Sequence, residues 1–226
     1  MEEDLKYYDP KNIEFNALIK LTNFKNKKVL DAGCGIARLT LPISRYARNV
    51  VGIDIDKNII RYCRLKKKRR NIKYFLSSIK NFEENGFDIT ILAQPAYNNF
   101  KENLYAINKI LKKRGKLIII RWVDKGNDYN SILTPFWNKD KKLIREVQNF
   151  SRIFTKTIKK FFKIKKIKII RTIASYPDRE KLSKMIIQDC PKSFTKKDEI
   201  ILNKLLKRYN HRKINISMKM YLCEKK

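Results

Sequence analysis

The sequence predicts an α/β fold with a mainly parallel sheet, and three observations lead to this expectation. Short apolar runs rich in Val, Ile and Leu alternate with longer segments of helical apolar spacing. Two of only six glycines, Gly33 and Gly35, follow the first run and allow a tight turn into a helix. The 226 residues, 43% of them hydrophobic, can bury a substantial core. Strands that alternate with helices imply right-handed crossovers, so neighbouring strands run parallel.

The first half of the chain holds the alternating elements in order. A helix through Phe15, Leu18 and Ile19 comes first. The predicted strands are 28–32, 49–54, 72–76, 87–93 and 116–121. The predicted helices between them are 38–46, 56–67 and 100–111. Because ligands bind beyond the carboxyl ends of strands in such sheets, the segments that follow these strands are the candidate site.

The second half departs from this tight alternation. Residues 122–137 are aromatic and loop-like, and we expect them to cover the site. Apolar spacing and cap residues predict the remaining helices, which are 141–162, 179–188 and a last one that ends at 209. A strand is predicted over 164–174, and strict alternation over 214–222 predicts a half-exposed edge strand.

The turn after the first strand carries the strongest local signal. It reads Val-Leu-Asp-Ala-Gly-Cys-Gly-Ile-Ala over 29–37, and Asp54 closes the next apolar run. The glycines let the backbone turn tightly against a ligand, and the N-terminus of the following helix points at that ligand. We therefore interpret the segment as a ligand-binding turn.

This segment resembles motif I of the class I S-adenosylmethionine-dependent methyltransferases. The resemblance covers about residues 29–121 and is closest to the broad type 11 group that includes ubiquinone and menaquinone biosynthesis methyltransferases. It implies a Rossmann-like seven-stranded sheet with an antiparallel C-terminal strand and helices on both faces. It also implies S-adenosyl-L-methionine as cofactor and S-adenosyl-L-homocysteine as product, with Asp54 on the ribose hydroxyls and Ile55 near the adenine. The cofactor-binding residues that it implies are Asp31, Ala32, Gly33, Cys34, Gly35, Asp54, Ile55, Ser78, Ile79 and Gln94.

The rival interpretation is the dinucleotide fingerprint Gly-x-Gly-x-x-Gly/Ala. That pattern needs a small residue at position 38, where this chain has Arg38. It also gives no role to Asp31, so the methyltransferase resemblance is favoured.

Two segments depart from the family pattern. An acidic residue after the third strand often receives the adenine amino group, whereas this chain has Ser77-Ser78-Ile79 there. Enzymes that methylate exocyclic base amines carry Asn/Asp/Ser-Pro-Pro-aromatic after the fourth strand, whereas this chain has Gln94-Pro95-Ala96-Tyr97. We interpret the second segment as a loop that lines the pocket, with Tyr97 packing over substrate or cofactor.

The net charge of +32 predicts contact with a polyanion, most simply RNA. Codon bias that enriches Lys is the bland explanation, but it does not by itself account for the scarcity of Glu. The densest basic run is 61–70, which covers the end of the predicted helix 56–67 and the loop after it. That end of the helix should lie at the edge of the sheet away from the cofactor. A second basic segment, 139–168, has phenylalanines interleaved at the spacing of a buried helix face.

The acceptor is less clearly indicated than the cofactor. Residues on the segments nearest the expected pocket are candidate substrate contacts, namely Tyr8, Tyr97, Trp122 and Trp137. No general base is evident, since the only histidine, His211, lies in a basic, polar segment, so the catalytic residues stay unassigned. Three functions remain open: an RNA methyltransferase, a small-molecule methyltransferase, and a non-catalytic nucleic-acid-binding protein that keeps the fold.

We expect a single domain over 1–226, with a cofactor-binding half over 1–121 and substrate-side helical additions over 122–163 and 178–210. The four cysteines are scattered and no metal-ligand spacing occurs, so neither a disulfide framework nor a metal site is indicated. The acidic N-terminus does not resemble a secretory signal, and no apolar run suits a membrane span. These features predict a cytoplasmic protein with reduced thiols.

Overall fold

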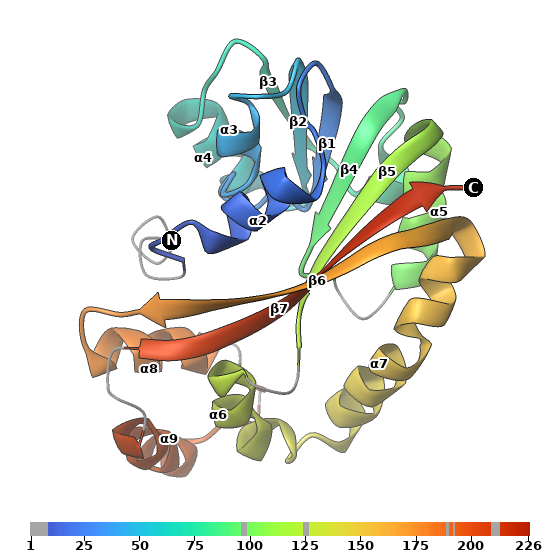
Figure 1. Ribbon diagram of the computed structural model, residues 1–226. Helices are drawn as coiled ribbons and strands as arrows, with labels where there is room; N and C mark the ends of the chain where they lie inside the picture. Colours follow the sequence, from blue (N-terminus) through green and yellow to red (C-terminus); the bar gives the residue numbers. More distant parts are fainter. Residues whose placement is uncertain (1–8, 96–98, 124–126, 189, 192, 209–212) are drawn as a thin grey trace. The chain divides into compact units, whose positions relative to one another are not determined.

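The computed structural model describes residues 9–226 apart from 96–98, 124–126, 189, 192 and 209–212. Its strands form one seven-stranded sheet in the order β3-β2-β1-β4-β5-β7-β6 (Figure 1). The first five pair in parallel, and the C-terminal strands make the sheet mixed. The predicted α/β class is therefore confirmed.

The parallel strands begin where the apolar runs begin. They are β1 (Lys28–Ala32), β2 (Asn49–Asp54), β3 (Ile72–Leu76), β4 (Phe87–Ala93) and β5 (Leu111–Trp122). The central register pairs Leu30 with Val51 of β2 and with Thr90 of β4. β5 starts earlier than predicted, because Leu111 already pairs with Phe87 and an irregularity in the pairing follows.

The helices of this half pack on the sheet as the apolar spacing requires. They are α2 (Ile13–Leu21), α3 (Thr40–Ile43), α4 (Lys57–Lys66), the 3-10 turn η1 (Ile79–Asn81) and α5 (Phe100–Ile110). α4 packs on β2 and β3. α3 is much shorter than the predicted 38–46, because Pro42 has no N–H and the flanking residues form turns instead.

Helices also occupy much of the second half. They are α6 (Asp128–Trp137), α7 (Lys141–Phe161), α8 (Arg179–Gln188) and α9 (Lys196–Arg208). The expectation of a loop over 122–137 is wrong, since most of it is α6. Asn127 caps this helix by accepting from the amides of Tyr129 and Asn130, and Tyr129 and Phe136 are buried.

The last two strands are β6 (Phe162–Ser175) and β7 (Lys213–Lys225). The prediction that the C-terminal strand lies at an edge is wrong, because β7 lies between β5 and β6. Its burial agrees with an interior position, since Ile214, Met218 and Met220 are fully buried. β6 is the strand at the edge, and its exposed face carries Ile167 and Ile169.

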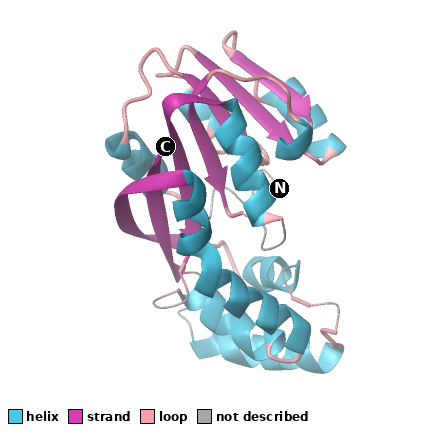
Figure 2. Cartoon of the chain, turned by 90° about the vertical axis from the view of Figure 1, so that its right-hand side faces the viewer, coloured by secondary structure: helices cyan, strands magenta, loops and turns pink. Residues whose placement is uncertain are grey.

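The chain divides into two compact units. One comprises residues 15–121, 154–169 and 219–226 and is called the sheet unit below. The other comprises 1–14, 122–153 and 170–218 and is called the helical unit, because it holds α6, α8 and α9 (Figure 2). The division of one domain into a cofactor half and substrate-side additions stays a prediction. None of the helices within the described residues is long and apolar enough to cross a membrane.

Candidate functional site

A cavity of about 560 Å³ lies at the carboxyl ends of β1–β4 in the sheet unit. Its volume is within the range of small-molecule sites, roughly 300–1,000 Å³. The lining residues follow the four strands or begin α5: Ala32, Gly33, Ile53, Asp54, Ile55, Ser77, Ser78, Ile79, Lys80, Leu92, Ala93, Gln94, Pro95, Asn99 and Asn103. This is the place where ligands bind in open parallel sheets.

Asp54 is held in position by backbone donors from two directions. Its Oδ2 accepts from the amide of Gly35 at 3.0 Å, and its Oδ1 accepts from the amide of Asp56 at 3.0 Å. The carboxylate is thus fixed against the glycine turn before any ligand arrives, yet it still lines the cavity. Each carboxylate oxygen has further acceptor capacity for a hydroxyl donor.

The glycine turn needs backbone conformations that other residues adopt at a cost. Gly33 has φ +76° and Gly35 has φ +49°, and the amides of Gly33 and Cys34 both donate to the carbonyl of Ile53 at 2.9 Å. These bonds pin the turn to the end of β2. Together with Asp54, they make the turn a rigid wall of the cavity.

Packing beneath the turn leaves no spare room. A Cβ on Gly52 would lie 2.8 Å from Cδ1 of Tyr74 and 3.1 Å from Sγ of Cys34. Cys34 and Cys63 are buried, and the thiol of Cys63 lies 3.2 Å from the carbonyl oxygen of Gly35. The hydrogen bond with Cys63 and burial raise the pKa of the Cys34 thiol, so it stays protonated and serves packing.

Asp31 lies behind the cavity wall, not on it. It is buried, and its Oδ2 accepts from the hydroxyl of Thr40 at 2.6 Å. Burial raises the pKa of the Asp31 carboxyl to about 6, although the hydrogen bonds from Thr40 act in the opposite direction. The carboxyl thus ties the end of β1 to the start of α3.

The structure brings most of the predicted cofactor residues to one cavity. Seven of the ten line it, namely Ala32, Gly33, Asp54, Ile55, Ser78, Ile79 and Gln94. Asp31, Cys34 and Gly35 are not among the lining residues but support the turn from behind or beside it. Ile55 is 77% exposed, which is unusual for a large apolar side chain and leaves a bare apolar surface beside Asp54.

The two segments that depart from the family pattern also reach the cavity. Ser78 uses its hydroxyl to accept from the amide of Asn81, so this oxygen already caps η1. Gln94 has φ +50°, and its amide donates to the carbonyl of Ile120 at 2.7 Å. The chain therefore turns sharply after β4 and brings Gln94 and Pro95 to the cavity.

Sequence reasoning missed several contributors to this site. Thr40, which bonds Asp31, gives no local signal beyond lying nine residues later in the same turn-helix segment. Asn99 and Asn103 reach the cavity from α5, an element that the sequence places only by its apolar face. Both reach the cavity because α5 packs against η1, which is a tertiary effect.

None of the predicted acceptor contacts is among the described residues that line this cavity. Tyr8 and Tyr97 lie outside the described residues, as does His211. Trp122 and Trp137 belong to the helical unit. There Trp122 packs edge-on against Tyr129, with ring centroids 4.8 Å apart, and Trp137 lines a separate cavity of about 400 Å³ between α6 and α7.

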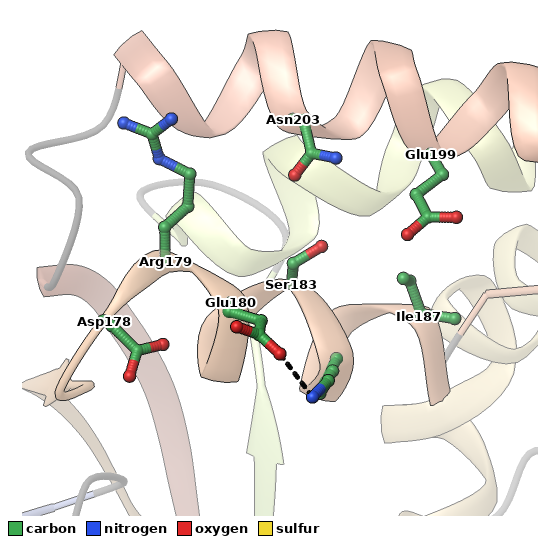
Figure 3. A pocket seen from close by; sticks show the side chains of 8 residues that line it. Asp178, Arg179, Glu180, Ser183, Ile187, Glu199 and Asn203 are labelled. Carbon is green, nitrogen blue, oxygen red and sulfur yellow. Dashed lines mark hydrogen bonds and ion pairs between the residues drawn. The ribbon is translucent and has the colours of Figure 1, made fainter.

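The helical unit contains a further cavity, of about 570 Å³, between α8 and α9 (Figure 3). Its lining mixes both signs of charge, with Arg179 and Lys184 beside Glu180 and Glu199, and Lys184 pairs with Glu180. Within the described part of the chain, no three His, Cys, Asp or Glu side chains gather as a metal site would require.

Comparisons with known proteins address the fold and the family. Residues 30–119 match the model of the methyltransferase domain family, type 11. The chain is 28% identical over 166 residues to a ubiquinone biosynthesis O-methyltransferase of Bartonella tribocorum, covering 61% of this chain and 64% of that protein. It is 29% identical over 153 residues to ribosomal RNA small subunit methyltransferase A of Wigglesworthia glossinidia brevipalpis, covering 55% and 56%. The chain thus spans less than two thirds of the length of these relatives.

The fold is shared much more widely than the sequence. BH2331 of Bacillus halodurans C-125 superposes with a TM-score of 0.67 at 12% identity, covering 93% of this chain and 98% of that one. At this identity the likeness shows the fold alone. The family match, the relatives and the fold agree with the motif at 29–37. The match over residues 30–119, the relatives and the shared fold together support a class I S-adenosylmethionine-dependent methyltransferase.

Proposed function

We propose that this protein transfers a methyl group from S-adenosyl-L-methionine to an acceptor, leaving S-adenosyl-L-homocysteine. The observation that carries the proposal is Asp54, which is fixed by the Gly35 and Asp56 amides at the wall of a cavity of suitable volume. A held carboxylate at the end of β2 suits two vicinal ribose hydroxyls, because charge-assisted hydrogen bonds are strong.

The remaining residues divide the rest of the cofactor among them. Ala32 and Gly33 present backbone to its methionine part, and Asp31, Cys34 and Gly35 support that turn from behind or beside it. The exposed side chain of Ile55 packs on the adenine, as does Ile79 from η1. Backbone groups around Ser78 bind the adenine edge, since the Ser78 hydroxyl already caps η1. Gln94 closes the cavity beside the reacting methyl group.

The cofactor supplies an activated methyl group on a positively charged sulfur. The protein's part is to align an acceptor lone pair with that methyl group and to exclude water, which can supply much of the rate enhancement. An acceptor that is already unprotonated at the reacting atom needs no general base from the protein.

We further propose RNA as the acceptor class, supported by the net charge of +32 and by the likeness to a ribosomal RNA methyltransferase. A small-molecule acceptor is the second candidate. It is favoured by the likeness to a ubiquinone biosynthesis enzyme and by a cavity lining that contains only one cation, Lys80, among the residues that the structure describes.

The experiment is incubation with methyl-labelled S-adenosyl-L-methionine and separate pools of RNA, protein and metabolites from the source cell. We expect label in one pool, RNA first, and clearly less label with the Asp54→Ala variant when the cofactor is limiting. Absence of cofactor binding by calorimetry would contradict the proposed activity, whereas label in the metabolite pool would replace RNA by the second candidate.

A further inference from the structure

Charge is segregated between the two edges of the parallel sheet. Residues 15–81 contain only three carboxylates, Asp31, Asp54 and Asp56, and all of them lie at the carboxyl ends of β1 and β2. The opposite, amino edge of β2 and β3 is built from the turn after α3 and the turn after α4. In those two turns every charged residue is a cation.

Six exposed cations form this surface, here called the basic edge: Arg45, Arg48, Lys66, Lys68, Arg69 and Arg70. Three hydrogen bonds place the two turns against each other. The side-chain amide of Asn71 donates to the carbonyls of Ser44 at 2.8 Å and Ala47 at 3.0 Å. The amide of Val50 donates to the carbonyl of Asn71 at 2.8 Å. The six side chains therefore share one stretch of surface.

The charges of the basic edge have no partner within the described part of the chain. None of the six side chains makes an ion pair or hydrogen bond with the described residues. Nearby cations differ in this respect. Lys28 pairs with Glu84 at 2.8 Å and Lys112 pairs with Asp88 at 2.8 Å. Arg64 donates to the carbonyl of Tyr74 and is thereby occupied.

The bland explanation is that these cations balance the dipole of α4. That effect is confined to the last turn of a helix, where Arg64 and Lys66 already lie. It gives no reason for Lys68, Arg69 and Arg70 beyond the helix end. It gives none for Arg45 and Arg48, which follow a different helix.

We propose that the basic edge is a docking surface for the phosphate backbone of a polynucleotide. Four of its six cations are arginines, whose guanidinium groups bind phosphate oxygens in pairs. Tyr46, which lies between Arg45 and Arg48 in sequence, is 47% exposed and offers a ring on which a base can stack. The surface carries few exposed apolar side chains, which favours a polynucleotide over a lipid bilayer.

The basic edge is separate from the proposed cofactor cavity. α4 begins at the carboxyl edge and ends at the amino edge, and its ten residues span about 15 Å. A polynucleotide held here is gripped at a distance from the methyl group, whether or not it is also the acceptor. The inference is thus independent of the proposed methyl transfer.

The test measures binding of a labelled single-stranded RNA of about 20 nucleotides by fluorescence anisotropy, without cofactor. The quadruple variant R45Q/R48Q/R69Q/R70Q should bind roughly 100-fold more weakly at about 0.1 M salt, because each lost phosphate contact removes about 0.7 from the salt slope. The control variant K101Q/K160Q/K163Q/K166Q removes the same charge from exposed lysines of the sheet unit that form no ion pair with the described residues. Its RNA affinity should fall less than about fivefold.

Two further arms keep the test decisive. The double variant R69Q/R70Q changes only two exposed side chains, and its RNA affinity should fall about tenfold. If the protein contacts the phosphate backbone, its affinity for single-stranded DNA of equal length should fall by the same factors in these variants. Equal losses in the quadruple variant and its control would overturn the proposal, since net charge alone would then explain binding. If the quadruple variant lost affinity only for phosphatidylserine vesicles and not for RNA, the proposal would be overturned in favour of a membrane surface.

Discussion

At the carboxyl edge of the parallel sheet two carboxylates are held by hydrogen-bond partners, whereas the six cations of the basic edge make no ion pair or hydrogen bond within the described residues. Asp54 accepts from two backbone amides and Asp31 from a threonine hydroxyl. The six cations of the basic edge have no such partners among the described residues. Fixed groups suit a small ligand of defined shape, because little entropy is lost on binding. Mobile cations suit a long, irregular polyanion, whose contacts need charge more than geometry.

The largest expected effect concerns Asp31 and pH. Its pKa rises from 3.8 in the unfolded chain to about 6 in the fold, so the folded state binds more protons between these values. Stability should therefore fall as pH rises from about 4 to 6, by up to roughly 3 kcal/mol from this group. Urea unfolding of wild type and Asp31→Asn across this range measures the difference in their free energies of unfolding. A difference that does not change with pH would contradict the burial of Asp31.

The second prediction concerns the cofactor. Asp54→Ala should weaken its binding about tenfold or more, because one charge-assisted hydrogen bond contributes roughly 1.5–3 kcal/mol. Asp56→Asn is the matched control, since the amide oxygen can still cap α4. RNA affinity should be unchanged in both variants. Calorimetry that finds equal cofactor affinity in Asp54→Ala and wild type would remove the ribose assignment.

The third prediction tests the packing beneath the glycine turn. Gly52→Ala places a Cβ against Tyr74 and Cys34, so the turn must shift, at a cost of about 1–3 kcal/mol in stability together with weaker cofactor binding. Gly86→Ala is a contrasting variant at the amino edge. It is strained at φ +76° but meets no neighbouring atom, so it should lose stability without losing cofactor affinity. Parallel denaturant and binding curves would separate the two.

The smallest expected effect is that of salt on the cofactor. Between about 0.05 and 0.5 M salt its affinity should change less than about threefold, because fixed, partly buried groups are screened weakly. RNA affinity should fall more than tenfold over the same range. Similar salt slopes for both ligands would remove the distinction between the two edges.

The strand and helix bounds of the sheet unit could be predicted wherever apolar runs were interrupted by polar ones. β1, β2, β3 and β4 have the predicted bounds because their pattern is local. α6 was missed because Pro135 and clustered aromatics break the helical pattern, although Asn127 was a visible cap. The interior place of β7 depends on which strands it inserts between, and the local alternation over 214–222 does not record that choice.

The candidate site was predictable to the extent that its residues follow strands directly. Asp54, Ile55, Ser78 and Gln94 line the cavity because they end or follow β2, β3 and β4. The contribution of Asn99 and Asn103 could not be predicted, since their approach to the cavity depends on how α5 packs. The segregation of charge also could not be predicted from the sequence, because cations from two distant turns meet only when β2 and β3 pair.

Amide hydrogen exchange with each ligand in turn tests most directly whether the two edges serve different ligands. S-adenosyl-L-homocysteine should protect residues 31–37, 54–57 and 77–81 and leave the basic edge unchanged. RNA without cofactor should protect residues 44–48 and 66–71. RNA protection confined to the carboxyl edge, or cofactor protection at the amino edge, would contradict the division of ligands described above.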